Sequence, residues 1–97
     1  MTGEPPQDAA HFSHPGLTFP ERMDIKVMGH HNPRFEALMH GLILRHVPAD
    51  RLHAVHARPS SAGKYLALTF TLTVNSYEEL SAIYHDLSRS DEVLYAI

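Results

Sequence analysis

A chain of 97 residues has room for one small domain, and its lack of cysteine excludes a disulfide framework, a thiolate nucleophile and a cysteine-bearing metal site. The formal net charge of −3 provides no overall attraction for a nucleic acid or an anionic membrane, and no apolar run approaches the roughly 18 residues of a membrane-spanning helix. Because its start lacks the basic and apolar parts of a secretory signal, the sequence predicts a cytoplasmic protein without nucleic-acid or membrane partners.

The beginning of the chain differs in composition from the remainder. Residues 1–18 are rich in proline and glycine and have no apolar periodicity, so we expect a disordered N-terminal tail. Phe19-Pro20 marks the point where the chain is expected to meet the domain, which comprises residues 19–97 as a single unit.

The first predicted strand covers Met23–Met28. Ile25 and Val27 alternate with polar residues, which places them on the buried face of a sheet. Gly29 is expected to end this strand.

A helix is expected to follow the first strand. Asn32 suits the N-cap and Pro33 the first helical position, where its missing N–H has no cost. Pro48 disfavours helical geometry at the preceding residue and so ends the helix. The apolar stripe of this helix consists of Phe35, Leu38, Met39, Leu42 and Ile43.

Two strands joined by a turn come next. Leu52–Arg58 is less regular and is predicted as an edge strand, with a register that the sequence leaves open. Pro59–Gly63 has the composition of a turn, and Lys64–Asn75 alternates between apolar and polar residues over its length. The even-numbered positions of this long strand are predicted as its buried face: Leu66, Leu68, Phe70, Leu72 and Val74.

The last two predicted elements are a helix and a strand. Ser76 and Glu79 have the spacing of a capping box, which predicts a helix start. A final strand is expected over residues 93–97. The apolar stripe of the second helix consists of Leu80, Ile83, Tyr84 and Leu87.

The predicted order of elements is therefore β-α-β-β-α-β, which indicates a ferredoxin-like α+β sandwich. Right-handed crossovers place both helices on one face of a four-stranded antiparallel sheet, with the first and third strands in the centre. The other face of the sheet stays uncovered.

Several short motifs resemble those of the YbeD-like family of small bacterial proteins, over roughly residues 19–97. An apparent extra residue pair near Leu52–Ala57 departs from the family pattern. The motifs are Phe19-Pro20, Ile25–Gly29, Arg45-His46 before Pro48, and Pro59-Ser60-Ser61-x-Gly63-x-Tyr65.

The resemblance implies an ACT-like ferredoxin fold. Members of the family have no characterised function, and their genes often lie near those of lipoate biosynthesis. By fold analogy and gene context, the resemblance implies a regulatory or adaptor role with no catalytic activity and no cofactor.

The loop after the first strand is the first candidate site, because ACT-like domains commonly hold an effector there. A helix start leaves backbone N–H groups free beside Arg34, which suits a carboxylate or a phosphate. The alternative is an ordinary polar loop with an asparagine cap. The predicted site for a small acidic metabolite consists of Gly29, His30, His31, Asn32 and Arg34.

Metal binding and nucleophilic catalysis are not favoured. His53 and His56 lie three positions apart on a strand, so they should point to opposite faces, and no histidine spacing predicts a metal site. Turn chemistry accounts for Ser60 and Ser61, so no catalytic residue is predicted.

RNA recognition and phosphate chemistry, two activities known for folds with the β-α-β-β-α-β order, are also disfavoured. An RNA-recognition module needs aromatic residues on the open faces of the central strands, where only Tyr65 is expected. A small phosphate-handling enzyme would need a glycine-rich cradle after the first strand. The sequence has Gly29 and Arg34 there but lacks the cradle.

The uncovered sheet face is the second candidate site. Its threonine-rich surface can simply be solvated, or it can form a homo-oligomer or bind a protein partner. The residues expected on this face are Lys26, Tyr65, Thr69, Thr71 and Thr73.

Overall fold

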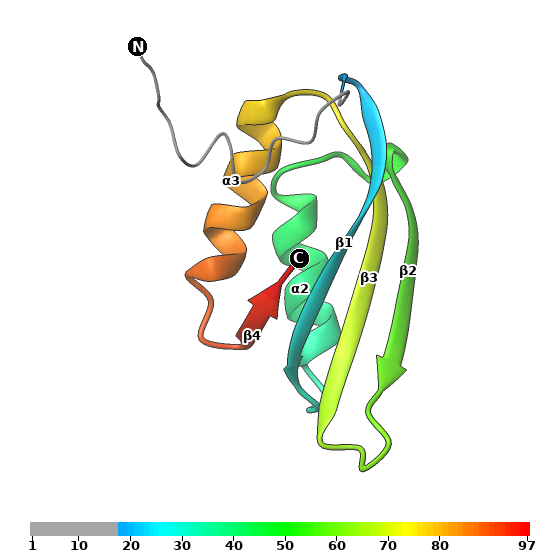
Figure 1. The fold of residues 1–97 in the computed structure, drawn as a ribbon, viewed down its shortest axis with the longest axis vertical. Coiled ribbons are helices and arrows are strands. Elements are labelled where there is room, and N and C mark those ends of the chain that lie inside the picture. The colour runs from blue at the N-terminus through cyan, green and yellow to red at the C-terminus, as the bar shows by residue number, and fades with distance from the viewer. Residues whose placement is uncertain (1–17) are drawn as a thin grey trace.

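The computed structural model describes residues 18–97, so all but the last residue of the predicted N-terminal tail lies outside the described residues. The elements confirm the predicted β-α-β-β-α-β order and add a short 3-10 helix, η1 (Figure 1). Of the helices in this part of the chain, none is long and apolar enough to cross a membrane. The elements are β1 (Glu21–His30), α2 (Phe35–Leu44), η1 (Ala49–Arg51), β2 (Leu52–Pro59), β3 (Tyr65–Val74), α3 (Tyr77–Ser88) and β4 (Val93–Ala96).

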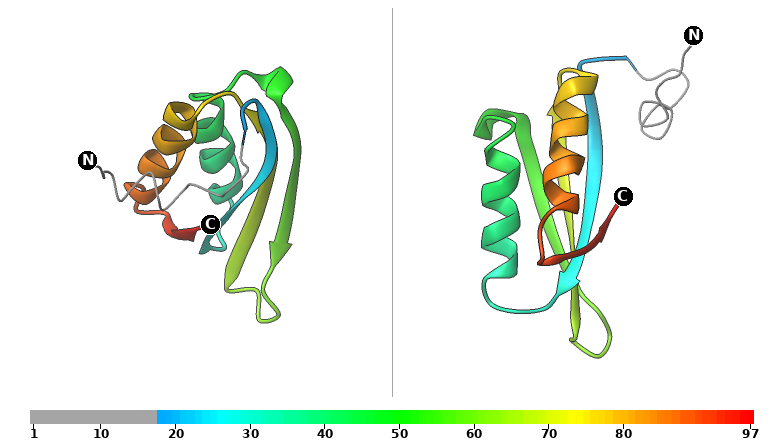
Figure 2. Two further views of the ribbon diagram at one scale, coloured as in Figure 1. Left: turned by 45° about the horizontal axis from the view of Figure 1, so that its top comes forward. Right: turned by 90° about the vertical axis from the view of Figure 1, so that its left-hand side faces the viewer.

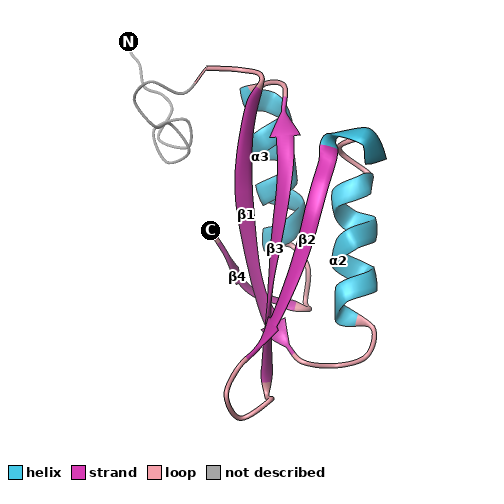
Figure 3. Cartoon of the chain, turned by 90° about the vertical axis from the view of Figure 1, so that its right-hand side faces the viewer, coloured by secondary structure: helices cyan, strands magenta, loops and turns pink. Residues whose placement is uncertain are grey.

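The four strands form one sheet in the order β2-β3-β1-β4, and each neighbouring pair is antiparallel. This order confirms that the first and third strands are central. Both helices cover the same face of the sheet, as the two views in Figure 2 show. The opposite face is uncovered by the described elements, and Figure 3 looks onto it with the strands in front of α3.

Alternation along β3 confirms the predicted buried face. Its even-numbered residues are buried, while the odd-numbered ones are partly exposed. Each large apolar side chain buried in this way contributes roughly 1.5–3 kcal/mol relative to exposure, so the sheet and helix layers hold together through this core. The other strand and helices supply Ile25, Val27, Phe35, Met39, Leu42, Ile43, Leu80, Ile83 and Leu87.

The prediction that Gly29 ends the first strand is wrong. β1 continues to His30, and Gly29 is buried in the strand between β3 and β4. A Cβ atom at this position would contact the Phe35 ring and would lie 2.6 Å from the Glu92 carbonyl oxygen. Glycine serves here for the close approach of a ring and a neighbouring backbone, not for a turn.

The predicted start of the first helix is also displaced. α2 begins at Phe35, and Arg34 occupies the N-cap position. Asn32 lies before the helix, where its side-chain oxygen accepts a hydrogen bond from the Arg34 N–H at 3.0 Å and closes a turn. Leu38, predicted in the apolar stripe, is 47% exposed, so the buried stripe is narrower than predicted.

β2 is confirmed as an edge strand, and its pairing is irregular where the sequence departs from the family pattern. The register against β3 shifts immediately after Leu52. His53 Nε2 lies 2.7 Å from the Thr73 hydroxyl, and His56 is opposite Thr69. Both histidines therefore lie on the open face, and the predicted opposite orientation is wrong because alternation does not hold across a bulge.

The predicted capping box is present in modified form. The Ser76 hydroxyl accepts a hydrogen bond from the Glu79 N–H at 3.1 Å and so caps α3. The Glu79 carboxylate accepts from the Asn75 N–H at 2.8 Å, one residue before the cap. Asn75 and Ser76, the two residues between β3 and α3, therefore each form a hydrogen bond with Glu79.

Charged contacts on the helix side of the sheet join segments that are distant in sequence. Arg51 of η1 donates two hydrogen bonds to the Glu79 carboxylate, at 2.7 and 2.8 Å. Asp86 of α3 lies 2.9 Å from His46 Nε2 and 3.1 Å from Arg45 Nη2. Hydrogen bonds from His46 and then Arg45 lower the pKa of Asp86 below its usual range.

Candidate functional site

The open sheet face brings together the residues predicted for it. Thr69 and Thr71 of β3 lie opposite Lys26 and Asp24 of β1. The Thr71 hydroxyl donates a hydrogen bond of 2.6 Å to Asp24. Tyr65 lies at the far end of the same row, beside the turn that joins β2 and β3.

Further residues on this face were not predicted. Arg22 lies opposite Thr73, and Arg58 of β2 lies opposite Ala67. The alternation of β1 already indicates that Arg22 shares a face with Lys26. The position of Arg58 depends on the register of β2, which the bulge makes unreadable from the sequence.

Apolar side chains occupy the part of the open face near β4. Met28 lies opposite Ala67 on one side and Tyr95 on the other. Ile97 exchanges backbone hydrogen bonds of 2.9 Å with Lys26 in both directions, which extends this row beyond β4. The exposed fractions of Tyr95 and Ile97 are 54% and 66%, so a substantial apolar surface stays available there.

The residues of the predicted ligand site do not come together in the structure, because they lie in different parts of the domain surface and core. Gly29 is in the core beneath Phe35. His30 lies on the open face with its ring centroid 5.4 Å from that of Tyr65. His31 points to the β2–β3 turn, where its Nδ1 is 3.2 Å from the Gly63 carbonyl oxygen.

The last two members of this predicted site differ in how they are engaged. Asn32 closes the turn before α2, and its amide group also lies 3.4 Å from a carboxylate oxygen of Glu92. Arg34 is exposed at the helix start. Of the five residues predicted for this site, Arg34 is the one with a permanently charged side chain, and it is exposed beside the first turn of α2.

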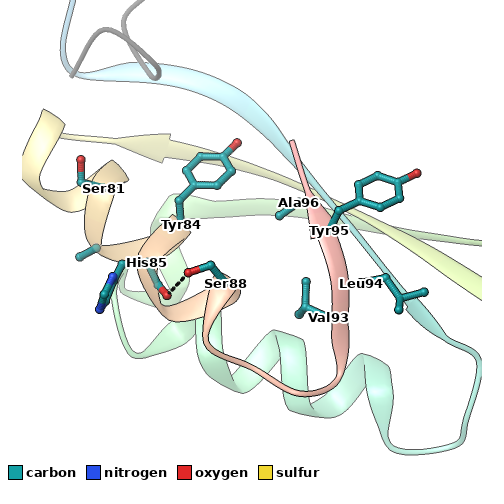
Figure 4. Close-up of a pocket in the computed structure, with 9 residues that line it drawn as sticks. Ser81, Tyr84, His85, Ser88, Val93, Leu94, Tyr95 and Ala96 are labelled. Carbon is teal, nitrogen blue, oxygen red and sulfur yellow. Dashed lines mark hydrogen bonds between the residues drawn. The ribbon is translucent and has the colours of Figure 1, made fainter. Parts of the chain in front are cut away.

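A groove of about 670 Å³ lies between α3 and β4, and sequence patterns did not indicate it. Figure 4 shows α3 forming one wall, with Tyr84 and Ser88, and β4 forming the other, with Val93 and Ala96. Burial raises the pKa of the half-buried Tyr84. In this wall the Ser88 hydroxyl donates to the His85 carbonyl oxygen at 2.8 Å, so it is engaged within the helix.

Metal ligands are not gathered in the described part of the chain. Across residues 18–97, no group of three or more His, Asp or Glu side chains is placed to hold a metal ion. His53 is instead hydrogen-bonded to a threonine, as described above.

Comparison with known proteins relates the whole domain to one family. The model of the family described as "Protein of unknown function (DUF493)" matches residues 14–97. A UPF0250 protein of Leptothrix cholodnii is 43% identical over 72 residues, which make up 74% of this chain and 79% of that protein.

Solved structures show the same fold at low sequence identity. The solution structure of protein HP0495 from H. pylori has a TM-score of 0.70 at 18% identity and covers 99% of this chain and 98% of its own. The ACT domain from the GTP pyrophosphokinase of Chlorobium tepidum has a TM-score of 0.60 at 12% identity, covering 76% of this chain and 91% of that domain. These likenesses confirm the predicted ACT-like, ferredoxin-like fold.

Proposed function

We propose that this chain, which belongs to the DUF493 family of proteins of unknown function, is a non-catalytic regulatory or adaptor module that binds a protein partner through its open sheet face. One observation carries the proposal: both helices cover one side of the sheet, and strands β1 to β4 expose the other (Figure 3). An antiparallel sheet with one uncovered face presents side chains from every strand to a partner without disturbing the core.

The engagement of polar groups on this face supports binding over catalysis. Asp24 is hydrogen-bonded to Thr71, and His53 to Thr73. General acid–base catalysis needs a titratable group within hydrogen-bond reach of the reacting atoms, usually oriented by a second group. On this face, Asp24 and His53 are each paired with a threonine and not with one another, and no described carboxylate is hydrogen-bonded to His30 or His56.

Site-specific photocrosslinking in the native host tests the proposal. We expect a photoreactive benzoylphenylalanine in place of Thr69, at the middle of the open face, to capture a discrete protein partner. The same group in place of Ala37, which is exposed on α2, is the matched control on the helix side. Capture from position 37 alone, or from neither position, would contradict the proposed function.

Binding of a small acidic metabolite at the start of α2 is a second candidate function. The observation in its favour is that no described side chain caps this helix, which leaves first-turn N–H groups beside the exposed Arg34. It ranks second because Glu36 already places a negative charge in that turn. The resemblance to YbeD-like proteins suggests acids related to lipoate metabolism as the first to test.

A thermal-shift series tests this second function. Lipoate, amino acids and organic phosphates are added separately to the full chain, and a bound acid is expected to raise the melting temperature with concentration. Arg34→Ala should remove that shift, whereas Arg89→Ala, at the end of α3, should retain it. A melting temperature that no acid raises would exclude this candidate among the compounds tried.

A further inference from the structure

We propose that the partner of the open face is a protein whose contact surface has acidic groups beside an apolar patch. This inference rests on the proposed function, since it specifies the chemistry of the partner that the sheet face would bind. Its basis is the separation of charge between the two faces of the molecule.

Three cationic side chains lie on the open face without a carboxylate partner. Arg22 and Lys26 belong to β1 and Arg58 to β2, and within residues 18–97 their side chains form no hydrogen bond or ion pair. Asp24, the one carboxylate on this face among the paired strand residues, accepts its hydrogen bond from Thr71 instead. The three cations are therefore available to carboxylates of another molecule.

The ion pairs of the described chain lie on the helix side. Arg45 and His46 contact Asp86, and Arg51 contacts Glu79. The remaining described carboxylates outside β1 are on the helices, on η1 and in the loop before β4: Glu36, Asp50, Glu78, Asp91 and Glu92.

The formal net charge of −3 conceals this separation. At physiological ionic strength the screening length is about 8 Å, whereas packed layers of secondary structure are about 10 Å apart. A partner at the open face therefore responds mainly to the charges of that face. There, Arg22, Lys26 and Arg58 outnumber Asp24, so the local charge is positive.

The cations adjoin the apolar part of the same face. Met28 and Tyr95 lie side by side, and Ile97 pairs with Lys26 at the strand edge. Protein interfaces commonly combine an apolar part, rich in tyrosine and methionine, with polar and charged groups beside it. Burial of the apolar patch near β4 would supply affinity, and the cations on β1 and β2 would select acidic groups on the partner.

A nucleic acid fits this face less well than an acidic protein. Base recognition by such a sheet needs aromatic side chains spread over the central strands. Along β1 and β3 the face has Tyr65 and His30, and their rings lie against each other at one end of the sheet. Threonines occupy the central positions of β3, where stacking residues would be needed.

Charge reversal combined with the photocrosslinker tests the inference. In the full chain carrying the photoreactive residue at position 69, Lys26→Glu and Arg58→Glu together should lower partner capture about tenfold or more. Arg89→Glu, a single charge reversal of the same kind at an exposed position at the end of α3, should leave capture unchanged. Mass spectrometry then locates the attachment point on the partner, and changing its neighbouring carboxylates to lysine should restore capture by the reversed face.

The outcomes separate this inference from the proposed function. If capture from position 69 persists after charge reversal, or if carboxylate-to-lysine changes on the partner do not restore it, the partner is not selected by acidic charge. In that case the inference fails and the binding function stands. A product sensitive to nuclease would identify a nucleic acid, and a product containing a second copy of this chain would identify self-association. Either result would overturn the inference, and an absence of any product at position 69 would overturn both proposals.

Discussion

Replacing Gly29 by alanine is expected to lower the free energy of unfolding by about 3 kcal/mol. The added Cβ atom would contact the Phe35 ring and lie 2.6 Å from the Glu92 carbonyl oxygen. Strand pairing on both sides of Gly29 prevents the backbone from moving away, because β3 and β4 flank it. Urea unfolding of the full chain, followed by circular dichroism, measures the difference.

Two further variants test whether the loss of stability in Gly29→Ala comes from the lack of space around position 29. Gly41 is exposed in α2, and a Cβ atom added there would meet no other side chain or element within 4 Å, so Gly41→Ala should stabilise the helix by about 0.5–1 kcal/mol. Combining Gly29→Ala with Phe35→Leu should cost less than the sum of the single changes, since the smaller side chain removes one of the two obstacles. Additive losses would show that the Phe35 ring does not limit the space at Gly29.

The fold could be predicted from the sequence because the patterns that indicate it each lie within a single helix or strand. The alternation of Lys64–Asn75 and the two helical stripes each depend on neighbours within one element, and together they determine the order of elements. The family match over residues 14–97 also confirms the resemblance to YbeD-like proteins that short motifs indicated. Composition and periodicity therefore sufficed for the architecture.

The errors share a physical cause, which is that they depend on contacts between distant segments. Gly29 has the appearance of a strand terminator, and only the position of the Phe35 ring reveals why it is buried within β1. His53 and His56 share a face because the register shifts against β3, and no local pattern encodes that shift. Predictions based on alternation fail where pairing is irregular.

The candidate site was only partly predictable for the same reason. Alternation along β1 and β3 identifies Lys26 and the threonines as one surface, since those strands pair regularly. The contributions of Arg58, Tyr95 and Ile97 come from edge strands whose register is set by tertiary pairing. The net charge of −3 also gives no indication that the open face is positive, because it does not show which face each charged residue occupies.

Removing the Arg51 guanidinium is expected to lower the free energy of unfolding by about 2 kcal/mol near neutral pH. Arg51 donates to both carboxylate oxygens of Glu79 and, at 3.0 Å, to the Thr73 carbonyl oxygen, so it joins η1, the end of β3 and the start of α3. The exposed fractions of the two charged side chains are only 21% and 17%. Arg51→Met retains the aliphatic stem but leaves the Glu79 carboxylate without its main partner.

The acid dependence of stability identifies the Arg51–Glu79 pair as the origin of this loss. The hydrogen bond from Arg51 holds the pKa of Glu79 below its ordinary value near 4.5, so the folded state binds the Glu79 proton less readily than the unfolded chain does. The resulting stabilisation is present above that ordinary value and is lost as the pH falls through the lower folded-state pKa. Urea unfolding of the wild type, Arg51→Met, Glu79→Gln and the double variant, between about pH 7 and about pH 3, should give a coupling free energy that decreases as the pH falls. Arg89→Met, which removes an exposed cation at the end of α3, is expected to change neither the stability nor its acid dependence. A coupling free energy that is the same at both ends of the pH range would show that the loss does not come from the charge of Glu79.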